Sequence, residues 1–322
     1  MTARRAIDAL LARYGRQATS TRLVARLDCE IHRITCGGGD LALRIYAEER
    51  ADRAAIDTEI GWLEALADAG LHVPGPLADR SGRTLQVWQP DPARPARHAV
   101  LLSWVGGRQL DRALRPLHLK RVGELTARMH RVAERLVAEG RIGTARRADM
   151  PDLAGWADGR RPHAGRVSPA LRSRLRETAR RLQNDIAALP GDSGSFGLVH
   201  GDLHLWNLLF AGGAAGAIDF SDCGFGPHAL DLAATLQYLR FPFVHNHDHR
   251  AVFPALQQAL FEGYAAHRAL PVRVEHQVEV CTVARMLNTV EWVVDVWPRP
   301  DLRAWGPGLL RRAGTIFDGY LR

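Results

Sequence analysis

One stretch of the chain, residues 198–232, constrains the fold and the chemistry more than any other. It reads LVHGDLHLWNLLF, then the glycine-rich turn AGGAAG, then AIDFSDCGFGPHALDLA. The pattern predicts two short strands, 207–210 and 217–220, joined by the turn, because glycine adopts positive φ at no steric cost. In a β-hairpin the first strand starts where the second ends. We therefore expect Asn207 and Asp219 to lie side by side, with Asp202 in the preceding loop.

Two carboxylates and an amide in such an arrangement favour a hard cation. Mg²⁺ prefers oxygen ligands and is usually held by one or two carboxylates together with substrate phosphates. The spacing from Asp202 to Asn207 is that of the protein-kinase catalytic loop, H-R-D-x-x-x-x-N, which a metal-binding Asp follows later in the chain. Here Gly201 stands in place of the Arg, and Asp219 takes the place of the later Asp. The pattern indicates phosphoryl transfer.

The blocks HGDLHLWNLL and IDFSDCGFGPHALDLA resemble the aminoglycoside phosphotransferase and choline kinase family. The family pattern is H-G-D-x-H-x-x-N, then I-D-[FW]-x-D, then D-L-A, and both blocks occur here in order. The resemblance is strong over 198–233 and weak elsewhere. It implies an α+β, bilobal protein-kinase-like fold, with a small antiparallel sheet in the N-lobe and a mostly helical C-lobe.

The resemblance also assigns roles to single residues. It makes Asp202 the catalytic base and gives Asn207 and Asp219 to Mg²⁺. Asp231 would brace the catalytic loop, and Asp222 would meet the acceptor or metal-bound waters, unless it is only a turn former. We interpret His200 and His204 as hydrogen-bonded loop residues rather than metal ligands. The supporting residues are thus His200, His204, Asp222 and Asp231.

The N-terminal part predicts the strands that would cover a nucleotide. Residues 21–46 alternate in polarity, with a turn at GGGD, and the strand LALRIY carries Arg44 where the family usually has a lysine. Lys120 is the only lysine in the chain, so no lysine lies nearby. Arg44 would contact phosphate, although it could instead face solvent. The turn at 27–30, expected to cover the phosphates, has no glycine.

A helix over 52–70 and a buried strand over 98–104 complete this part. Glu59 is the residue expected to pair with the strand cation, and Glu64 is its rival. Val105-Gly106-Gly107 indicates a hinge, whose residues Ser103, Trp104 and Val105 would meet the nucleobase through their backbone. The predicted domains are therefore an N-lobe over 1–102, a hinge over 103–107 and a C-lobe over 108–322.

Composition bounds the class of protein. The 322 residues carry a net charge of +8, but the arginines are spread along the chain without an aromatic-basic cluster, so we expect no nucleic-acid partner. There is no run of eighteen apolar residues and no secretory leader, so we expect no membrane association. The four cysteines form no CxxC pair, which is typical of reduced thiols in a cytoplasmic protein.

The sequence thus predicts an ATP-dependent enzyme that moves the γ-phosphoryl group to a hydroxyl of a small molecule, with Mg²⁺. Aminoglycoside-, homoserine- and choline-like acceptors all stay open, and GTP is not excluded as the nucleotide. One alternative is a bacterial stress-response-type protein Ser/Thr kinase, and another is a nucleotide-binding pseudokinase. Acidic residues of the C-terminal helices either line a site for a cationic acceptor or face solvent. The sequence does not give the oligomeric state.

Overall fold

The structure is a computed structural model that describes residues 3–26, 29–47, 52–143, 148, 150–161, 167–241, 247–296 and 299–322. The chain divides into two compact units. The first unit holds residues 1–108, 136–143 and 209–221, and the second holds 109–135, 144–208 and 222–322. Each helix within the described ranges is too short or too polar to cross a lipid bilayer.

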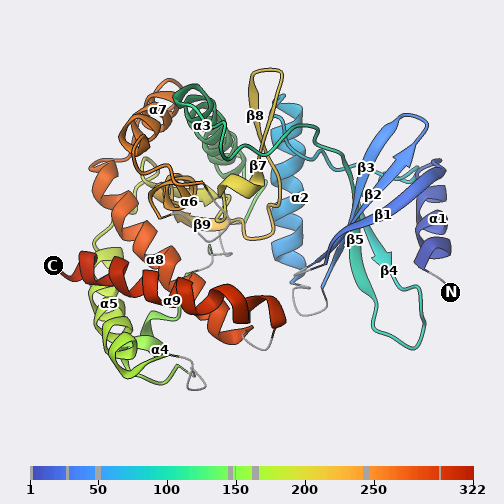
Figure 1. Ribbon diagram of the computed structural model, residues 1–322. Coiled ribbons are helices and arrows are strands. Elements are labelled where there is room, and N and C mark those ends of the chain that lie inside the picture. The colour runs from blue at the N-terminus through green and yellow to red at the C-terminus, as the bar shows by residue number, and fades with distance from the viewer. Residues whose placement is uncertain are drawn as a thin grey trace. The chain divides into compact units, whose positions relative to one another are not determined.

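The first unit is built on a five-stranded antiparallel sheet (Figure 1). Its strands are β1 (Ala18–Arg26), β2 (Cys29–Cys36), β3 (Gly39–Tyr46), β4 (Leu85–Trp88) and β5 (Arg97–Ser103). They lie in the order β1-β2-β3-β5-β4. The reversal between β2 and β3 falls at Gly37 and Gly38, within the predicted GGGD turn. Leu27 and Asp28, half of the turn expected to cover the phosphates, lie outside the described residues.

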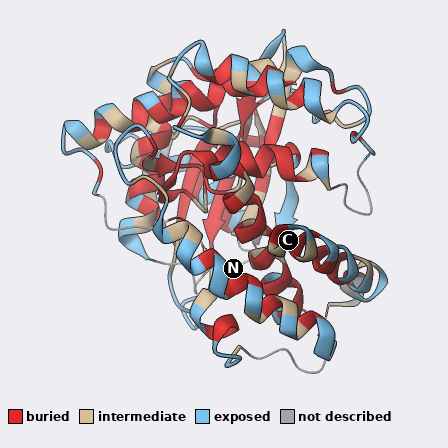
Figure 2. Ribbon diagram, turned by 90° about the vertical axis from the view of Figure 1, so that its left-hand side faces the viewer, coloured by how far each residue is buried: buried red, intermediate tan, exposed pale blue. Residues whose placement is uncertain are grey.

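The two faces of the sheet carry different helices. Side chains alternate between faces along a strand, so Leu41 and Leu43 of β3 join the apolar core that includes Leu11 of helix α1 (Ala3–Arg13). Arg44, on the other face, contacts helix α2 (Arg53–Asp68) through Glu59. Most of the β3 and β5 side chains are buried, as the red strands of Figure 2 show. The alternation therefore points Arg44 to the face of the sheet opposite the core that α1 covers.

A short hairpin, β7 (Leu208–Ala211) and β8 (Ala214–Ala217), follows residues 200–207, which we call the catalytic loop after their predicted role. Gly212 and Gly213 form its turn with φ of 55° and 80°, values that favour glycine. The predicted second strand, 217–220, was wrong in its bounds. Because these two glycines suffice for the reversal, the strand starts at Ala214 and ends at Ala217, which leaves Asp219 beyond it.

The second unit is mostly helical. Its helices are α4 (Leu153–Ala157), α5 (Pro169–Ala187), α6 (Ala229–Arg240), α7 (Phe253–Ala265), α8 (Val274–Asp295) and α9 (Pro300–Leu321), and helix α3 (Pro116–Ala138) belongs to it up to Arg135. Apolar side chains of α4, α5, α8 and α9 form one core. Helix α6 is buried at all but two of its positions, so neighbouring elements cover it on most sides.

Two four-residue strands bring the catalytic loop beside α6. Strand β6 (Phe196–Val199) pairs antiparallel with β9 (Gly224–Pro227), and Val199 lies opposite Gly224. The chain leaves β6 directly into His200, and it leaves β9 into α6. The backbone N–H of His228, just before α6, donates to the Ser195 carbonyl at 2.8 Å. The first turn of α6 is therefore held next to the start of the loop.

Helices α3 and α7 cross at a pair of glycines. A Cβ built on Gly123 would overlap the Leu260 carbonyl oxygen, and one built on Gly263 would overlap the Lys120 carbonyl oxygen. Because both obstacles are backbone atoms, neither can move aside without shifting a helix. The two backbones approach this closely only because neither position has a side chain.

We expect Gly263→Ala to destabilise the protein by roughly 1–3 kcal/mol, because the added methyl group overpacks the helix crossing. Helix propensity alone would give the opposite sign, since alanine is favoured over glycine by about 1 kcal/mol in a helix. Gly308→Ala in α9, where a Cβ would meet only the end of Arg311 at 3.9 Å, is the matched control and should be neutral or stabilising. Urea unfolding followed by circular dichroism measures both; equal effects would contradict the close crossing.

Candidate active site

A buried carboxylate holds the backbone of the catalytic loop. Asp231, in the first turn of α6, is fully buried and accepts hydrogen bonds from the backbone N–H groups of His200 and Gly201, both at 2.9 Å. It also accepts from His130 Nε2 of α3 at 3.0 Å. Burial opposes the charge, but the hydrogen bonds from His130 and His200 hold the pKa of Asp231 below its ordinary value.

The loop takes a conformation that suits glycine. Gly201 has φ of +83°, in the left-handed region, and a Cβ there would overlap the backbone carbonyl oxygen of Asp222. Thus Gly201 both permits the turn into Asp202 and allows the segment after β8 to pass close behind it. In this way Asp222, a predicted supporting residue, contributes to the loop through its backbone.

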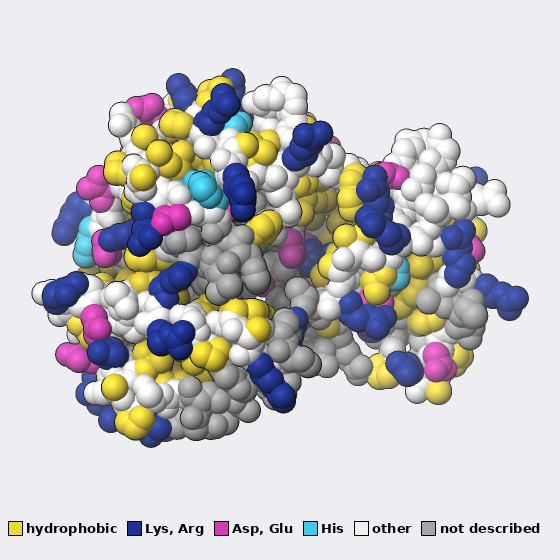
Figure 3. Space-filling model, in the orientation of Figure 1, with side chains coloured by type: hydrophobic (Ala, Val, Ile, Leu, Met, Phe, Trp, Pro, Cys, Tyr) yellow, Lys and Arg dark blue, Asp and Glu magenta, His cyan; other side chains and the backbone are white. Residues whose placement is uncertain are grey.

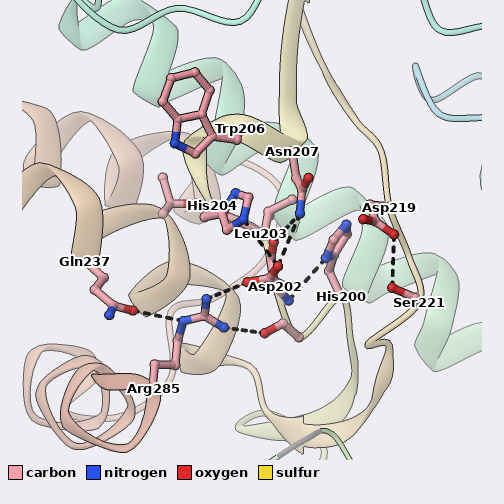
Figure 4. A network of polar contacts seen from close by, with 12 residues as sticks. His200, Asp202, Leu203, His204, Trp206, Asn207, Asp219, Ser221, Gln237 and Arg285 are labelled. Carbon is pink, nitrogen blue, oxygen red and sulfur yellow. Dashed lines mark hydrogen bonds and ion pairs between the residues drawn. The ribbon is translucent and has the colours of Figure 1, made fainter. Parts of the chain in front are cut away.

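The Asp202 side chain lies at the centre of a polar network in the second unit (Figure 4). Its Oδ1 accepts from Arg285 Nη2 of α8 at 2.6 Å. Its Oδ2 lies 3.3 Å from His204 Nε2 and accepts a long contact from Asn207 Nδ2 at 3.4 Å. The side chain keeps 30% of its surface exposed, so it remains accessible to a ligand.

These neighbours favour the ionised form of Asp202. Burial raises its pKa, but His204 and Arg285 outweigh burial and bring the pKa below its ordinary value. Burial also lowers the pKa of His204, so Arg285 is the neighbour that keeps its positive charge at neutral pH. Asp202 is therefore a carboxylate, the form that a proton acceptor requires.

The two predicted supporting histidines line the same loop. His200 is fully buried, and its Nδ1 accepts from the Asp202 backbone N–H at 3.3 Å. The His204 ring packs edge-on against Tyr238 of α6, with 5.2 Å between the ring centroids. Both side chains thus contact Asp202 or its backbone, as hydrogen-bonded loop residues would.

Asn207 ends the 3₁₀ turn Leu205–Asn207, just before β7. Its amide nitrogen donates to the Asp202 carbonyl oxygen at 2.9 Å as well as to the side chain. Because the nitrogen makes these bonds, the amide oxygen is the atom that Asn207 can offer to a cation. Asn207 is 8% exposed, so neighbouring residues hold its side chain in place.

Asp219, in the first unit, lies at a strained point of the backbone. Its φ is +63°, an uncommon value for a residue other than glycine. Its Oδ1 accepts from Ser221 Oγ at 3.0 Å (Figure 4) and from Arg44 Nη2 at 3.1 Å. The side chain is 50% exposed, so its carboxylate is within reach of solvent. Strain of this kind is frequent at functional sites.

Arg44 and Glu59 form a buried ion pair in the same unit. Arg44 Nη1 donates to Glu59 Oε1 at 2.7 Å, and the Tyr46 hydroxyl donates to the other carboxylate oxygen at 3.3 Å. Both charged side chains are less than 5% exposed, so Arg44 does not face solvent. The rival acid, Glu64, accepts from Thr84 instead. Arg44 thus joins two carboxylates, those of Glu59 and Asp219.

Two of the predicted hinge residues form hydrogen bonds within the first unit. The Ser103 backbone N–H donates to the Gly75 carbonyl at 2.8 Å, and the Ser103 hydroxyl accepts from the Gly75 N–H. The Trp104 N–H donates to the Asp40 carbonyl at 3.3 Å. These bonds fix the segment that leads to Val105, and they occupy the two amides that precede it.

Sequence reasoning missed Arg285 and the partners of the acidic side chains on the C-terminal helices. Among the described residues of the C-terminal helices, Glu291 accepts from Trp156 Nε1 at 2.7 Å, and Glu279 pairs with Arg240 at 3.5 Å. Asp295 pairs with Arg161. An arginine therefore lies close to each of these three acids, since Arg161 Nη2 is also 3.8 Å from Glu291 Oε2. Nothing in the sequence pattern distinguished Arg285 from the many solvent-facing arginines.

The described residues hold no group of three or more Asp, Glu, His or Cys side chains arranged for a metal ion. A cation held by one carboxylate and one amide, completed by phosphate and water, would not make such a group. The four cysteines, which all lie within the described ranges, form no disulfide bond.

Residues 29–270 match the model of the phosphotransferase enzyme family. The chain belongs to this family. Over 266 residues it is 30% identical to a homoserine kinase of Rhodopseudomonas palustris, and the match covers 79% of this chain and 74% of that protein. The predicted family and the predicted enzyme class, a phosphotransferase, are thereby confirmed.

Solved structures confirm the predicted fold. An amicoumacin kinase in complex with AMP-PNP and Ca²⁺ is similar with a TM-score of 0.79 and 19% identity, covering 99% of this chain and 94% of that one. A microcompartment-associated aminopropanol kinase is similar with a TM-score of 0.78 and 22% identity, covering 98% and 96%. The chain therefore has the kinase-like α+β fold of these proteins.

We expect Asp231→Asn to destabilise the second unit by about 2–4 kcal/mol at pH 7, because an amide replaces one of two buried acceptors with a donor. The pKa of Asp231 is lowered in the folded chain, so its stabilisation is present above about pH 4 and fades as the pH falls below that value. The difference from wild type should shrink accordingly.

Hydrogen exchange read by mass spectrometry over residues 198–204 checks the same contact, since the His200 and Gly201 amides should lose protection in Asp231→Asn. Asp318→Asn is the matched control, because Asp318 makes an exposed ion pair with Arg174 in the same unit. Unchanged protection of the loop in Asp231→Asn would contradict the bracing role.

Proposed function

We propose that this chain is an ATP- and Mg²⁺-dependent kinase that phosphorylates the hydroxyl group of a small amino alcohol of the homoserine type. The observation that carries the proposal is the Asp202 side chain, held by the loop and by Arg285 yet 30% exposed. A carboxylate in this state can orient an acceptor hydroxyl and take its proton while the γ-phosphoryl group is transferred.

The proposal assigns the metal to Asn207 and Asp219. Their donor set, an amide oxygen and a carboxylate, consists of the hard oxygen ligands that Mg²⁺ prefers. When bound, Mg²⁺ would neutralise charge on the transferring phosphate. The Asn207 nitrogen is tied to Asp202, which orients the amide oxygen, and Arg44 and Ser221 orient the Asp219 carboxylate.

The proposal assigns the nucleotide to the first unit. Arg44 would contact phosphate oxygens, as the strand cation does in kinase-like folds, with Glu59 holding its other end. Since the Ser103 and Trp104 amides already donate within the chain, the backbone of Val105 is the part of the predicted hinge that we assign to the base edge. Either ATP or GTP fits a contact of this kind.

We choose the acceptor class from the charges of the residues near Asp202. Arg285 of α8 contacts Asp202 and carries a positive charge. The acids Glu279, Glu291 and Asp295 of the same helix each contact a partner in this chain. A polycationic aminoglycoside needs unpaired acids, whereas a small zwitterion does not. The similarity to homoserine kinase supports the same choice.

The positive charge of the chain does not point to a nucleic acid. Figure 3 shows Lys and Arg side chains dispersed among acidic and apolar ones on the face in view. Electrostatic binding of a phosphodiester backbone uses a basic patch or stripe. The proposed partners are therefore the nucleotide and the small acceptor.

The test is release of ADP or GDP, with Mg²⁺, against L-homoserine, aminopropanol, choline and an aminoglycoside. We expect turnover to be fastest with L-homoserine. Asp202→Asn should lower kcat by roughly 10²–10⁴-fold, the range for loss of a general base. The exposed Asp158 of the same unit, changed to Asn, is the control. Phosphate on protein substrates alone would favour a protein kinase, and binding without turnover a pseudokinase.

We expect Arg44→Lys to weaken binding of Mg²⁺–ATP by about 5–30-fold, since a single ammonium group cannot reproduce the two-sided contact of the guanidinium with Glu59 and Asp219. The KM for the acceptor should stay within about twofold. Isothermal titration calorimetry measures the nucleotide affinity. Arg53→Lys, at an exposed ion pair of α2, is the control, and equal affinities of all three proteins would refute the assignment of Arg44.

A further inference from the structure

Arg285 joins three elements of the second unit at one guanidinium group (Figure 4). Its Nη2 donates to Asp202 Oδ1 at 2.6 Å, and its Nη1 donates to the Gly201 carbonyl oxygen. Its Nε donates to Gln237 Oε1 of α6 at 3.1 Å. The fork of the guanidinium therefore spans two successive residues of the catalytic loop and anchors them to α8 and α6.

This arrangement is not that of a solvent-facing surface charge. The Arg285 side chain is 14% exposed, and a buried cation is tolerated only when it is paired and hydrogen-bonded. All three nitrogen atoms of its guanidinium have partners within the chain. Three of its five N–H donors are thus directed to the loop and to α6.

The contact selects one oxygen of the carboxylate. Arg285 holds Oδ1, while Oδ2 lies by His204 and Asn207. The planar fork resists rotation better than a single point charge would, because it also holds the Gly201 carbonyl. Asp202 is consequently held in one rotamer, with Oδ1 on Arg285 and Oδ2 facing His204 and Asn207.

Helix α6 holds the loop at two points, once directly and once through Arg285. Asp231 binds the His200 and Gly201 amides directly, and Gln237, almost two turns later, binds Arg285. Gln237 is 1% exposed, so its position is set by packing. The backbone of the loop and the rotamer of Asp202 thus depend on the same helix.

We propose that Arg285 is a positioning residue that fixes the Asp202 carboxylate for proton acceptance, an inference that rests on the proposed function in which Asp202 is the base. Small misplacements of a reacting group cost large factors in rate, because they remove the near-attack geometry. Loss of Arg285 should therefore lower kcat while the substrates still bind.

The test compares Arg285→Met, Arg285→Lys and the wild type in steady-state kinetics with Mg²⁺–ATP and the best acceptor. Arg285→Met should lower kcat by about 10²-fold and leave both KM values within about threefold. Arg285→Lys should recover about tenfold of that loss, since an ammonium group can keep the contact with Asp202 but not the whole fork.

Arg240→Met is the matched control. Arg240 of α6 pairs with Glu279 of α8 at 3.5 Å, so it also links these two helices, but its side chain is 44% exposed and makes no contact with the loop in the residues that the structure describes. We expect its kcat to equal that of wild type. An equal loss in both variants would mean that Arg285 acts only by holding the helices together, and it would overturn the proposal.

A double-mutant cycle supplies a readout that does not need turnover. If Arg285 and Asp202 are in contact, the melting temperature of Arg285→Met/Asp202→Asn should fall by less than the sum of the falls in the two single variants. Additive losses would overturn the role of Arg285 even if the enzyme is active. A rise in acceptor KM at constant kcat would make Arg285 an acceptor ligand instead. A wild-type enzyme without turnover would overturn the proposed function, and with it this role.

Discussion

The fold of the catalytic loop depends on one buried carboxylate. Asp231 accepts hydrogen bonds from two consecutive backbone amides of the loop, at the point where Gly201 turns the chain. Its third bond, from His130, continues through the Tyr264 hydroxyl at 2.9 Å to Arg268. Buried polar networks are stable only when every member is satisfied, so this chain of contacts ties α3, α6 and α7 to the loop.

A second constraint is the cation on β3. An arginine at this strand position binds Glu59 and Asp219 with different nitrogen atoms, whereas a lysine would offer a single centre of charge. The Asp219 carboxylate thereby has a fixed partner in its own unit, despite the positive φ of its backbone. A chain whose single lysine is Lys120 thus still has a buried cation on the strand where kinase-like folds have one.

The sequence predicted the parts of this structure that local pattern determines. The glycine turn between β2 and β3 follows from the local pattern, and the pairing of Arg44 with Glu59 follows from the resemblance to kinase-like folds. The second hairpin strand was misplaced because Gly212 and Gly213 reverse the chain sooner than predicted. Arg285 could not be predicted, since its contact with Asp202 joins residues 83 positions apart and depends on helix packing.

The central claim is that Asp202 serves phosphoryl transfer to an alcohol oxygen. Phosphorus-31 NMR of a reaction with ATP, Mg²⁺ and L-homoserine tests it most directly, because the chemical shift and proton coupling identify the atom that carries the phosphate. The account predicts a phosphate monoester on the side-chain oxygen, formed by wild type and absent with Asp202→Asn. An ester that forms at the same rate with Asp202→Asn, or phosphate released only to water, would contradict it.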